Sequence, residues 1–194
     1  MNKRIRFSLL TLLILLCSTV AGAATGYTYD FNTTIATSNH DFVLGSNWGH
    51  VVGSGDYDGY GPYYMSYSYT NDGGFGGTGS LIAYRQYAGD NGGGTECYDL
   101  LVTPLVSGEI TMKVKAHTNA SNSNPSFVEI YAIDAAGTTR GSLIQRFTAT
   151  SGYADITGQK DWKQISLTLS EEQRIAIRAQ YVYLDDFTAA SVNI

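Results

Sequence analysis

The sequence contains very few cysteines. Among its 194 residues only Cys17 and Cys97 are cysteine, and Cys17 lies in an N-terminal stretch that we expect to be removed. Without a second cysteine, Cys97 cannot form a disulfide within the mature chain. A lone cysteine in a strand is most often a small buried apolar residue rather than a nucleophile. Stability must therefore come from a packed core, supplemented at most by a bound metal ion.

Positive charge is also scarce. The chain carries 12 Lys and Arg against 17 Asp and Glu, and Lys3, Arg4 and Arg6 belong to the N-terminal stretch. Without those three cations, the balance of the remaining chain is 9 − 17 = −8. The other Lys and Arg residues form no cluster in the sequence. This argues against nucleic acid and against anionic membrane surfaces as partners.

Long apolar runs are missing except near the N-terminus. Residues 9–20 are mostly apolar, follow the three cations and precede Ala21-Gly22-Ala23. This order of segments is typical of a secretory signal peptide. A lipid anchor on Cys17 is the disfavoured alternative, because bulky Leu16 precedes it. We predict a signal peptide over 1–23, a single module over 24–194, and a secreted or cell-surface location without membrane insertion after cleavage.

Helical periodicity is nearly absent, and alternation of apolar and polar residues takes its place. In 109–117 the even-numbered residues are apolar and the odd-numbered ones are polar, which is typical of a half-buried antiparallel strand. The one helical signal is a single turn at 170–173. Similar alternating runs, separated by turn residues, occur at 27–33, 42–52, 62–70, 79–87, 97–104, 126–134, 142–149, 161–169, 173–180 and 181–189.

Many short strands with glycine-rich turns predict an all-β fold, an antiparallel sandwich or barrel. We favour an antiparallel two-sheet β-sandwich of the jelly-roll type, with the first and last strands adjacent. The residues expected in or beside its core are Trp48, Leu81, Leu101, Ile110, Val114, Ile130, Ile165 and Ile177.

Several motifs occur in an order that resembles a known family. Residues 29–32 (Tyr-Asp-Phe-Asn) are followed by Trp48, by residues 98–104 (Tyr-Asp-Leu-Leu-Val-Thr-Pro), by Trp162 and by residues 183–187 (Tyr-Leu-Asp-Asp-Phe). This order resembles the cleaved adhesin or choice-of-anchor J domain of Bacteroidetes surface proteins, which is related to MAM-type domains. The resemblance spans nearly the whole mature chain.

The resemblance implies a two-sheet jelly roll of the galactose-binding-domain type. It also implies structural calcium, and a role in adhesion or in binding carbohydrate or protein. Both tryptophans flank strands at places typical of the family, so we expect Trp48 and Trp162 to belong to the core. Asn32 stands where family members often have glutamate. A calcium site that uses Asn32 would therefore have one negative charge fewer than in those members.

The candidate calcium ligands are oxygen-bearing side chains. Asp185 and Asp186 are neighbours in a strand, so they should point to opposite faces, and one of them would be costly to bury alone. A calcium ion held by that carboxylate and by Asn32 of the first strand would offset the cost. The alternative is that both carboxylates cap loop amides or remain solvated. Asp56 and Asp58 are less favoured ligands, because their loop lacks the later ligands of an EF-hand.

Tyrosines between residues 57 and 69 are the best candidates for ligand contact. Aromatic rings stack on the faces of sugars, and the tyrosine hydroxyl adds a polar group. Alternation assigns part of this set to the core and leaves Tyr57, Tyr60 and Tyr64 as the predicted glycan-binding residues. Packing against neighbouring strands is the alternative role for each ring.

Motifs for catalysis are absent from the sequence. The three histidines form no metal-binding pattern, and there is neither a Gly-x-Ser-x-Gly elbow nor a phosphate-binding loop. A chance pair of carboxylates such as Glu96 and Asp99 could still serve a glycosidase. We therefore predict a non-catalytic extracellular binding or adhesion module, with glycan favoured over protein as the ligand. The alternatives are a structural spacer within a longer polypeptide and, third, a glycan-cleaving jelly-roll enzyme.

Overall fold

The computed structural model describes residues 26–31, 35–36, 42–45, 47–52, 67–70, 74–77, 79–83, 99–118, 120–121, 125–148 and 161–193. The predicted signal peptide, 1–23, lies outside these residues. Among them, no helix is long and apolar enough to cross a membrane. The only helix in these segments is the short 3₁₀ helix η1 (Phe75–Gly77). The all-β prediction is confirmed.

The strands lie close to the predicted runs and are shortest in the first half of the chain. The N-terminal strands are β1 (Tyr27–Tyr29), β2 (Ile35–Ala36), β3 (Phe42–Val43), β4 (Gly49–Val52), β5 (Tyr67–Thr70) and β6 (Ser80–Ala83). The C-terminal strands are β7 (Asp99–Val102), β8 (Leu105–Ala116), β9 (Phe127–Ile133), β10 (Arg140–Thr148), β11 (Lys163–Gln173), β12 (Ile175–Gln180) and β13 (Val182–Asn193).

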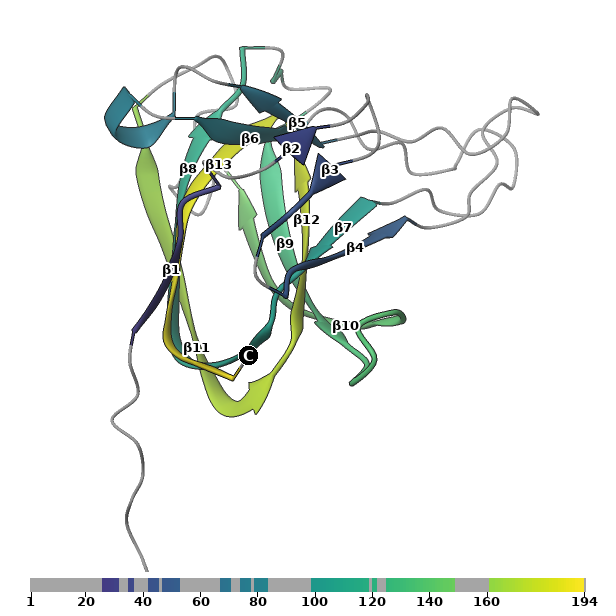
Figure 1. Ribbon diagram of the computed structural model, residues 1–194. Helices are drawn as coiled ribbons and strands as arrows, with labels where there is room; N and C mark the ends of the chain where they lie inside the picture. The colour runs from purple at the N-terminus through teal and green to yellow at the C-terminus, as the bar shows by residue number, and fades with distance from the viewer. Residues whose placement is uncertain are drawn as a thin grey trace, which may run out of the picture.

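Two antiparallel sheets face each other and form a sandwich (Figure 1). The six-stranded sheet has the order β11-β8-β13-β6-β5, and β1 also pairs with β13. The five-stranded sheet has the order β10-β9-β12-β7-β4, and β2 pairs with β3 in a small separate sheet. Tyr27 of β1 lies opposite Ala189 of β13, so the first and last strands are adjacent, as predicted. The prediction of a two-sheet jelly-roll sandwich is confirmed.

The core lies between the two sheets and contains the residues that alternation assigned to it. In β8 the even-numbered residues from Ile110 to Ala116 are at most 3% exposed, whereas the odd-numbered ones are partly exposed. All eight predicted core residues are buried: Trp48, Leu81, Leu101, Ile110, Val114, Ile130, Ile165 and Ile177. Period-two alternation therefore identified the inner faces of both sheets.

One prediction about the second half of the chain is wrong. Trp162 is only half-buried and contacts Phe75 and Tyr183 instead of the core. Its position is out of phase with inward-facing Ile165, so its side chain lies on the opposite face of the sheet. Residues 170–173, whose sequence could begin a helical turn, are the end of β11, where Gln173 pairs with Val106 of β8. Pairing in the sheet outweighs the weak local preference for a helix.

The Leu-Val-Thr-Pro segment lies where the chain crosses from one sheet to the other. It joins β7 of the five-stranded sheet to β8 of the six-stranded sheet. The buried Thr103 donates its backbone N–H to Ile175 O at 3.0 Å, and its hydroxyl accepts a hydrogen bond from Ile175 N at 3.1 Å. Arg174 donates to Thr103 O at 3.0 Å. These hydrogen bonds therefore connect the β7–β8 crossover to the β11–β12 crossover, which also passes from one sheet to the other.

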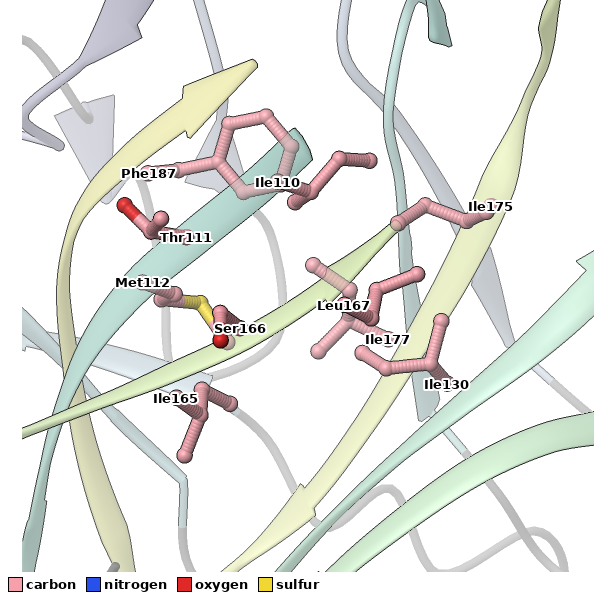
Figure 2. Close-up of a pocket in the computed structure, with 10 residues that line it drawn as sticks. All are labelled: Ile110, Thr111, Met112, Ile130, Ile165, Ser166, Leu167, Ile175, Ile177 and Phe187. Carbon is pink, nitrogen blue, oxygen red and sulfur yellow. The ribbon is translucent and has the colours of Figure 1, made fainter. Parts of the chain in front are cut away.

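A small pocket lies inside the sandwich, between β8 and β11 on one side and β9 and β12 on the other. Figure 2 shows its lining residues, which are Ile110, Thr111, Met112, Ile130, Ile165, Ser166, Leu167, Ile175, Ile177 and Phe187. Only two of them carry a hydroxyl, and none is charged. Ligand sites combine apolar walls with several convergent polar groups, so we interpret this pocket as imperfect packing of the core.

Candidate functional site

The outer face of the six-stranded sheet, which points away from the core, carries a row of large side chains. Tyr183 of β13 pairs with Lys115 of β8 on one side and with Ile82 of β6 on the other. Trp162 immediately precedes β11, and its ring centre lies 4.8 Å from Lys115 Nζ. The strands β11, β8, β13 and β6 lie side by side, and neighbouring strands are about 4.8 Å apart. This row of side chains therefore extends roughly 14 Å across the sheet.

Aromatic rings follow one another along this face. We call the rings of Phe75, His117, Trp162, Tyr181 and Tyr183 the aromatic row. Successive ring centres are 6.0 Å apart from Phe75 to Trp162, 6.4 Å from Trp162 to Tyr183, 5.2 Å from Tyr183 to His117, and 6.3 Å from His117 to Tyr181. Phe75 is 37% exposed, and the other four residues are half-buried. The row is therefore continuous and open to solvent along its length.

Two lysines of β8 lie among these rings. Lys113 Nζ lies 4.7 Å from the centre of the Phe75 ring and donates to Gln164 Oε1 at 3.0 Å. Lys115 Nζ lies 4.8 Å from the centres of both Trp162 and Tyr183. Burial lowers the pKa of the Lys115 ammonium and that of the His117 imidazole. Attraction between cation and ring face holds these long side chains against the aromatic row.

The buried carboxylate of Asp185 positions one end of the row. Its Oδ2 accepts a hydrogen bond from Phe75 N at 2.8 Å, and its Oδ1 accepts one from Asp186 N at 2.9 Å. Burial raises the pKa of Asp185 to about 6, against the lowering effect of these two hydrogen bonds, and the negative charges of Asp186 and Asp30 raise it further. By holding the backbone of η1, Asp185 fixes where the Phe75 ring lies.

The same carboxylate belongs to an acidic corner where the first and last strands meet, formed by Asp30, Asp185 and Asp186. Tyr29 of β1 lies opposite Phe187 of β13, which brings the following Asp30 close to the other two. The register of β13 is irregular here, and Asp186 has a φ of 44°. Asp185 is fully buried and Asp186 is partly exposed, so one carboxylate of the pair is buried, as predicted.

The predicted metal ligands are described only in part. Asn32, Asp56 and Asp58 lie outside the described residues. Within the residues described, no group of three or more His, Cys, Asp or Glu side chains is arranged to hold a metal ion. Both oxygens of Asp185 accept loop or strand amides, as the alternative to a metal site predicts.

The acidic corner nevertheless has the chemistry that suits a hard cation. Each carboxylate oxygen of Asp185 has a second lone pair beyond the one used by its amide. Ser80 precedes Leu81, which pairs with Leu184, so Ser80 lies next to the position of Asp185. Among the residues that the structure describes, the buried Ser80 Oγ has no hydrogen-bond partner. Carboxylate and hydroxyl oxygens are ligands that calcium accepts, and its charge would offset the repulsion among the carboxylates.

A second polar cluster lies on the outer face of the five-stranded sheet. Glu129 and Arg178 are only 4% and 7% exposed, and Arg178 Nη1 lies 3.0 Å from Glu129 Oε2. The Tyr131 hydroxyl donates to the same oxygen at 2.8 Å, and Arg146 Nη1 lies 3.4 Å from Oε1. A single carboxylate surrounded by cations lacks the paired acids of a glycosidase. We interpret this cluster as structural.

The sequence-based assignment of the ligand site missed the aromatic row. Tyr57, Tyr60 and Tyr64, the predicted glycan-binding residues, lie in a part of the chain that the structure does not describe. The alternation of 109–117 correctly placed Lys113, Lys115 and His117 on the outer face. The same analysis of 162–169, where the odd-numbered residues from Ile165 onward face inward, would have placed Trp162 there too.

No protein-family model and no curated protein matches this sequence. Solved structures do match it. The K1 cleaved adhesin domain of Lys-gingipain from Porphyromonas gingivalis W83 is 19% identical with a TM-score of 0.54, covering 87% of this chain and 99% of that domain. The K2 cleaved adhesin domain of Lys-gingipain is 14% identical with a TM-score of 0.53, covering 85% of this chain and 99% of that domain.

The xylan-binding module CBM15 is also similar, at 10% identity and a TM-score of 0.46, covering 88% of this chain and 99% of that module. That likeness is too low to support an inference about the ligand. The two cleaved adhesin domains superpose better, and each matches over almost its full length. The chain therefore has a fold like that of the cleaved adhesin domains, as the order of its motifs predicts.

Proposed function

We propose that this chain is a non-catalytic extracellular binding module whose ligand is a glycan. The supporting observation is the aromatic row, five successive rings on one exposed sheet face. Aromatic faces provide apolar contact area at fixed positions, which suits the apolar faces of sugar rings. The ring planes of His117 and Tyr181 differ by 23° and those of His117 and Tyr183 by 31°, so these three rings form the flattest part of the row, whereas Phe75 and Trp162 stand edge-on to each other at 78°. A role in adhesion agrees with the name of the domains that share the fold. The extracellular location rests on the predicted signal peptide.

The glycan prediction can be tested on an array with two sets of variants. Trp162→Ala or Tyr183→Ala should weaken binding about 5- to 30-fold, since one stacked ring contributes roughly 1–2 kcal/mol. Tyr131→Ala is the matched control, because it removes a half-buried tyrosine from the opposite sheet. The triple variant Tyr57→Ala, Tyr60→Ala and Tyr64→Ala tests the site expected from the sequence.

Each result of this array experiment discriminates between explanations. If only the triple variant loses binding, glycan recognition stands and the site lies in the tyrosine-rich segment. If wild-type protein binds nothing on the array, the proposal fails and a structural spacer becomes the better description.

We also propose that calcium binds at the acidic corner, through Asp185 or Asp186 together with Asn32, with Asp56 or Asp58 as less favoured ligands. A ligand that binds only the native state stabilises it by about 2.7 kcal/mol at 100 times its Kd. For a domain of this size, that corresponds to roughly 5–10 °C in melting temperature. Calcium should raise the melting temperature of the wild type, chelator should reverse the effect, and Asp185→Asn should abolish it.

The matched control is Asp134→Asn, which alters an exposed carboxylate that caps a turn far from this corner in sequence. That variant should keep the full response to calcium. Identical melting temperatures in calcium and in chelator would contradict the proposal and leave Asp185 as a cap for the amides of η1 and β13.

The pH dependence of this calcium response follows from the pKa of Asp185. Without calcium this pKa is about 6, above its ordinary value of 3.8, so the folded state holds the proton more tightly than the unfolded chain. The stability contributed by this proton is fully present below about pH 4 and is lost as the pH rises through about 6. Calcium must displace the proton, so its stabilising effect should be larger at about pH 7.5 than at about pH 5.

A further inference from the structure

We propose that the glycan is an anionic polysaccharide, bound along the aromatic row and selected by Lys113 and Lys115. This inference rests on the proposed glycan-binding function and adds the chemical class of the ligand and the residues that recognise it.

The first argument is the placement of charge on the outer face. The chain as a whole carries a net charge of −5. On β8, however, Lys113, Lys115 and His117 follow one another at every second position, so all three lie on the outer face beside the rings. Asp185, the carboxylate closest to the row, is fully buried and binds two amides. Asp161 and Glu109 are exposed at the margins of this face, and exposed Asp30 and partly exposed Asp186 lie in the acidic corner at the Phe75 end of the row.

The second argument is the distance between ammonium groups and rings. Lys115 Nζ lies 4.8 Å from the centres of both Trp162 and Tyr183. A sugar stacked on the ring face that Lys115 covers would displace the ammonium to the edge of the stack, where the flexible lysine side chain would meet the equatorial substituents of the sugar. A carboxylate or sulfate there would form a charge-assisted hydrogen bond, which is stronger than a bond from the ammonium to a neutral hydroxyl.

The third argument is the spacing of the cations. Residues two apart in a strand are separated by roughly 6.6 Å, so Lys113 and Lys115 present two positive charges at a regular interval. Lys113 lies over Phe75, and Lys115 lies over Trp162 and Tyr183, so each cation accompanies its own rings. Repeated pairs of ring and cation suit a polymer that carries a charge on successive sugar units.

Binding of oligogalacturonate and of its fully methyl-esterified form tests the inference, because esterification removes the charge and leaves the sugar rings unchanged. Titration calorimetry without calcium should give at least tenfold tighter binding to the charged form, and binding should weaken as salt is added. Sulfated carrageenan oligosaccharides form a third arm. Tighter binding there would support the anionic class, with sulfate as the source of the charge.

The variants Lys113→Gln and Lys115→Gln should each weaken binding of the charged ligand about tenfold and change binding of the ester less than twofold. Lys163→Gln is the matched control, because Lys163 is exposed and its position is in phase with the inward-facing residues of β11.

Equal affinity for the charged and esterified forms would overturn this inference, as would lysine variants without effect. If Trp162→Ala still weakened binding about 5- to 30-fold in that case, the proposed glycan function would survive. Absence of binding to every polysaccharide would overturn both.

Discussion

Replacing Arg178 by methionine should lower the free energy of unfolding by about 3 kcal/mol. Arg178 and Glu129 form an ion pair in which neither residue is more than 7% exposed. Removing the guanidinium leaves the carboxylate of Glu129 buried, with the Tyr131 hydroxyl at 2.8 Å and Arg146 at 3.4 Å as its remaining partners. A buried charge that loses its main partner is far more costly than the pair itself contributes.

Arg146→Met is the matched control for this prediction. Arg146 contacts the same carboxylate, but half of its side chain is exposed to solvent. Exposed ion pairs contribute little, so this variant should lose less than about 1 kcal/mol. Urea denaturation of both variants, followed by tryptophan fluorescence, gives the comparison. Equal losses for Arg146→Met and Arg178→Met would show that burial does not determine the value of this pair.

Replacing Phe187 by alanine should cost about 4 kcal/mol, the largest effect that we expect from a single truncation in the core. Phe187 is 1% exposed and packs edge-to-face against Trp48, with ring centres 5.0 Å apart. It also contacts Tyr27 of β1 at 6.4 Å. The variant therefore loses buried apolar area and leaves a cavity between β13, β1 and the residues at the start of β4.

Phe75→Ala makes the same truncation on the surface and is the natural control. Phe75 is 37% exposed and contacts Trp162 at 6.0 Å. Its removal should cost about 1 kcal/mol or less. Thermal unfolding of both variants would settle the comparison, and a cost for Phe187→Ala as small as that for Phe75→Ala would contradict the packing described here.

The sequence predicted the sandwich because burial on one face leaves a pattern of period two. Ile110 and Val114 alternate with polar residues, whereas Leu101 lies between apolar Leu100 and Val102, which are buried as well. Local alternation does not tell which strands become neighbours. The pairing of Glu129 with Arg178, 49 residues later, depends on β9 and β12 being adjacent, and no local pattern indicates that.

The candidate site was harder to predict for the same reason. The aromatic row combines Phe75 of η1, Trp162 just before β11, His117 just after β8, Tyr181 just before β13 and Tyr183 of β13. It exists only once the order of the strands is known. The pair Asp185 and Asp186 was recognised as significant, but the burial of Asp185 comes from the backbone of η1, 110 residues earlier. The tyrosine-rich segment remains a prediction, since Tyr57, Tyr60 and Tyr64 are not among the residues described.

The antiparallel pairing of β1 with β13 has a mechanical consequence. Because Tyr27 lies opposite Ala189, the chain enters at Gly26 and leaves at Asn193 on the same end of the sandwich (Figure 1). Tension applied between these two points would pull β1 and β13 apart from that end and load their hydrogen bonds one after another. A parallel pair of terminal strands would instead be sheared and would load its bonds together. Under force, β1 should therefore detach first and expose the edge of β13 around Phe187, which is buried in the folded domain.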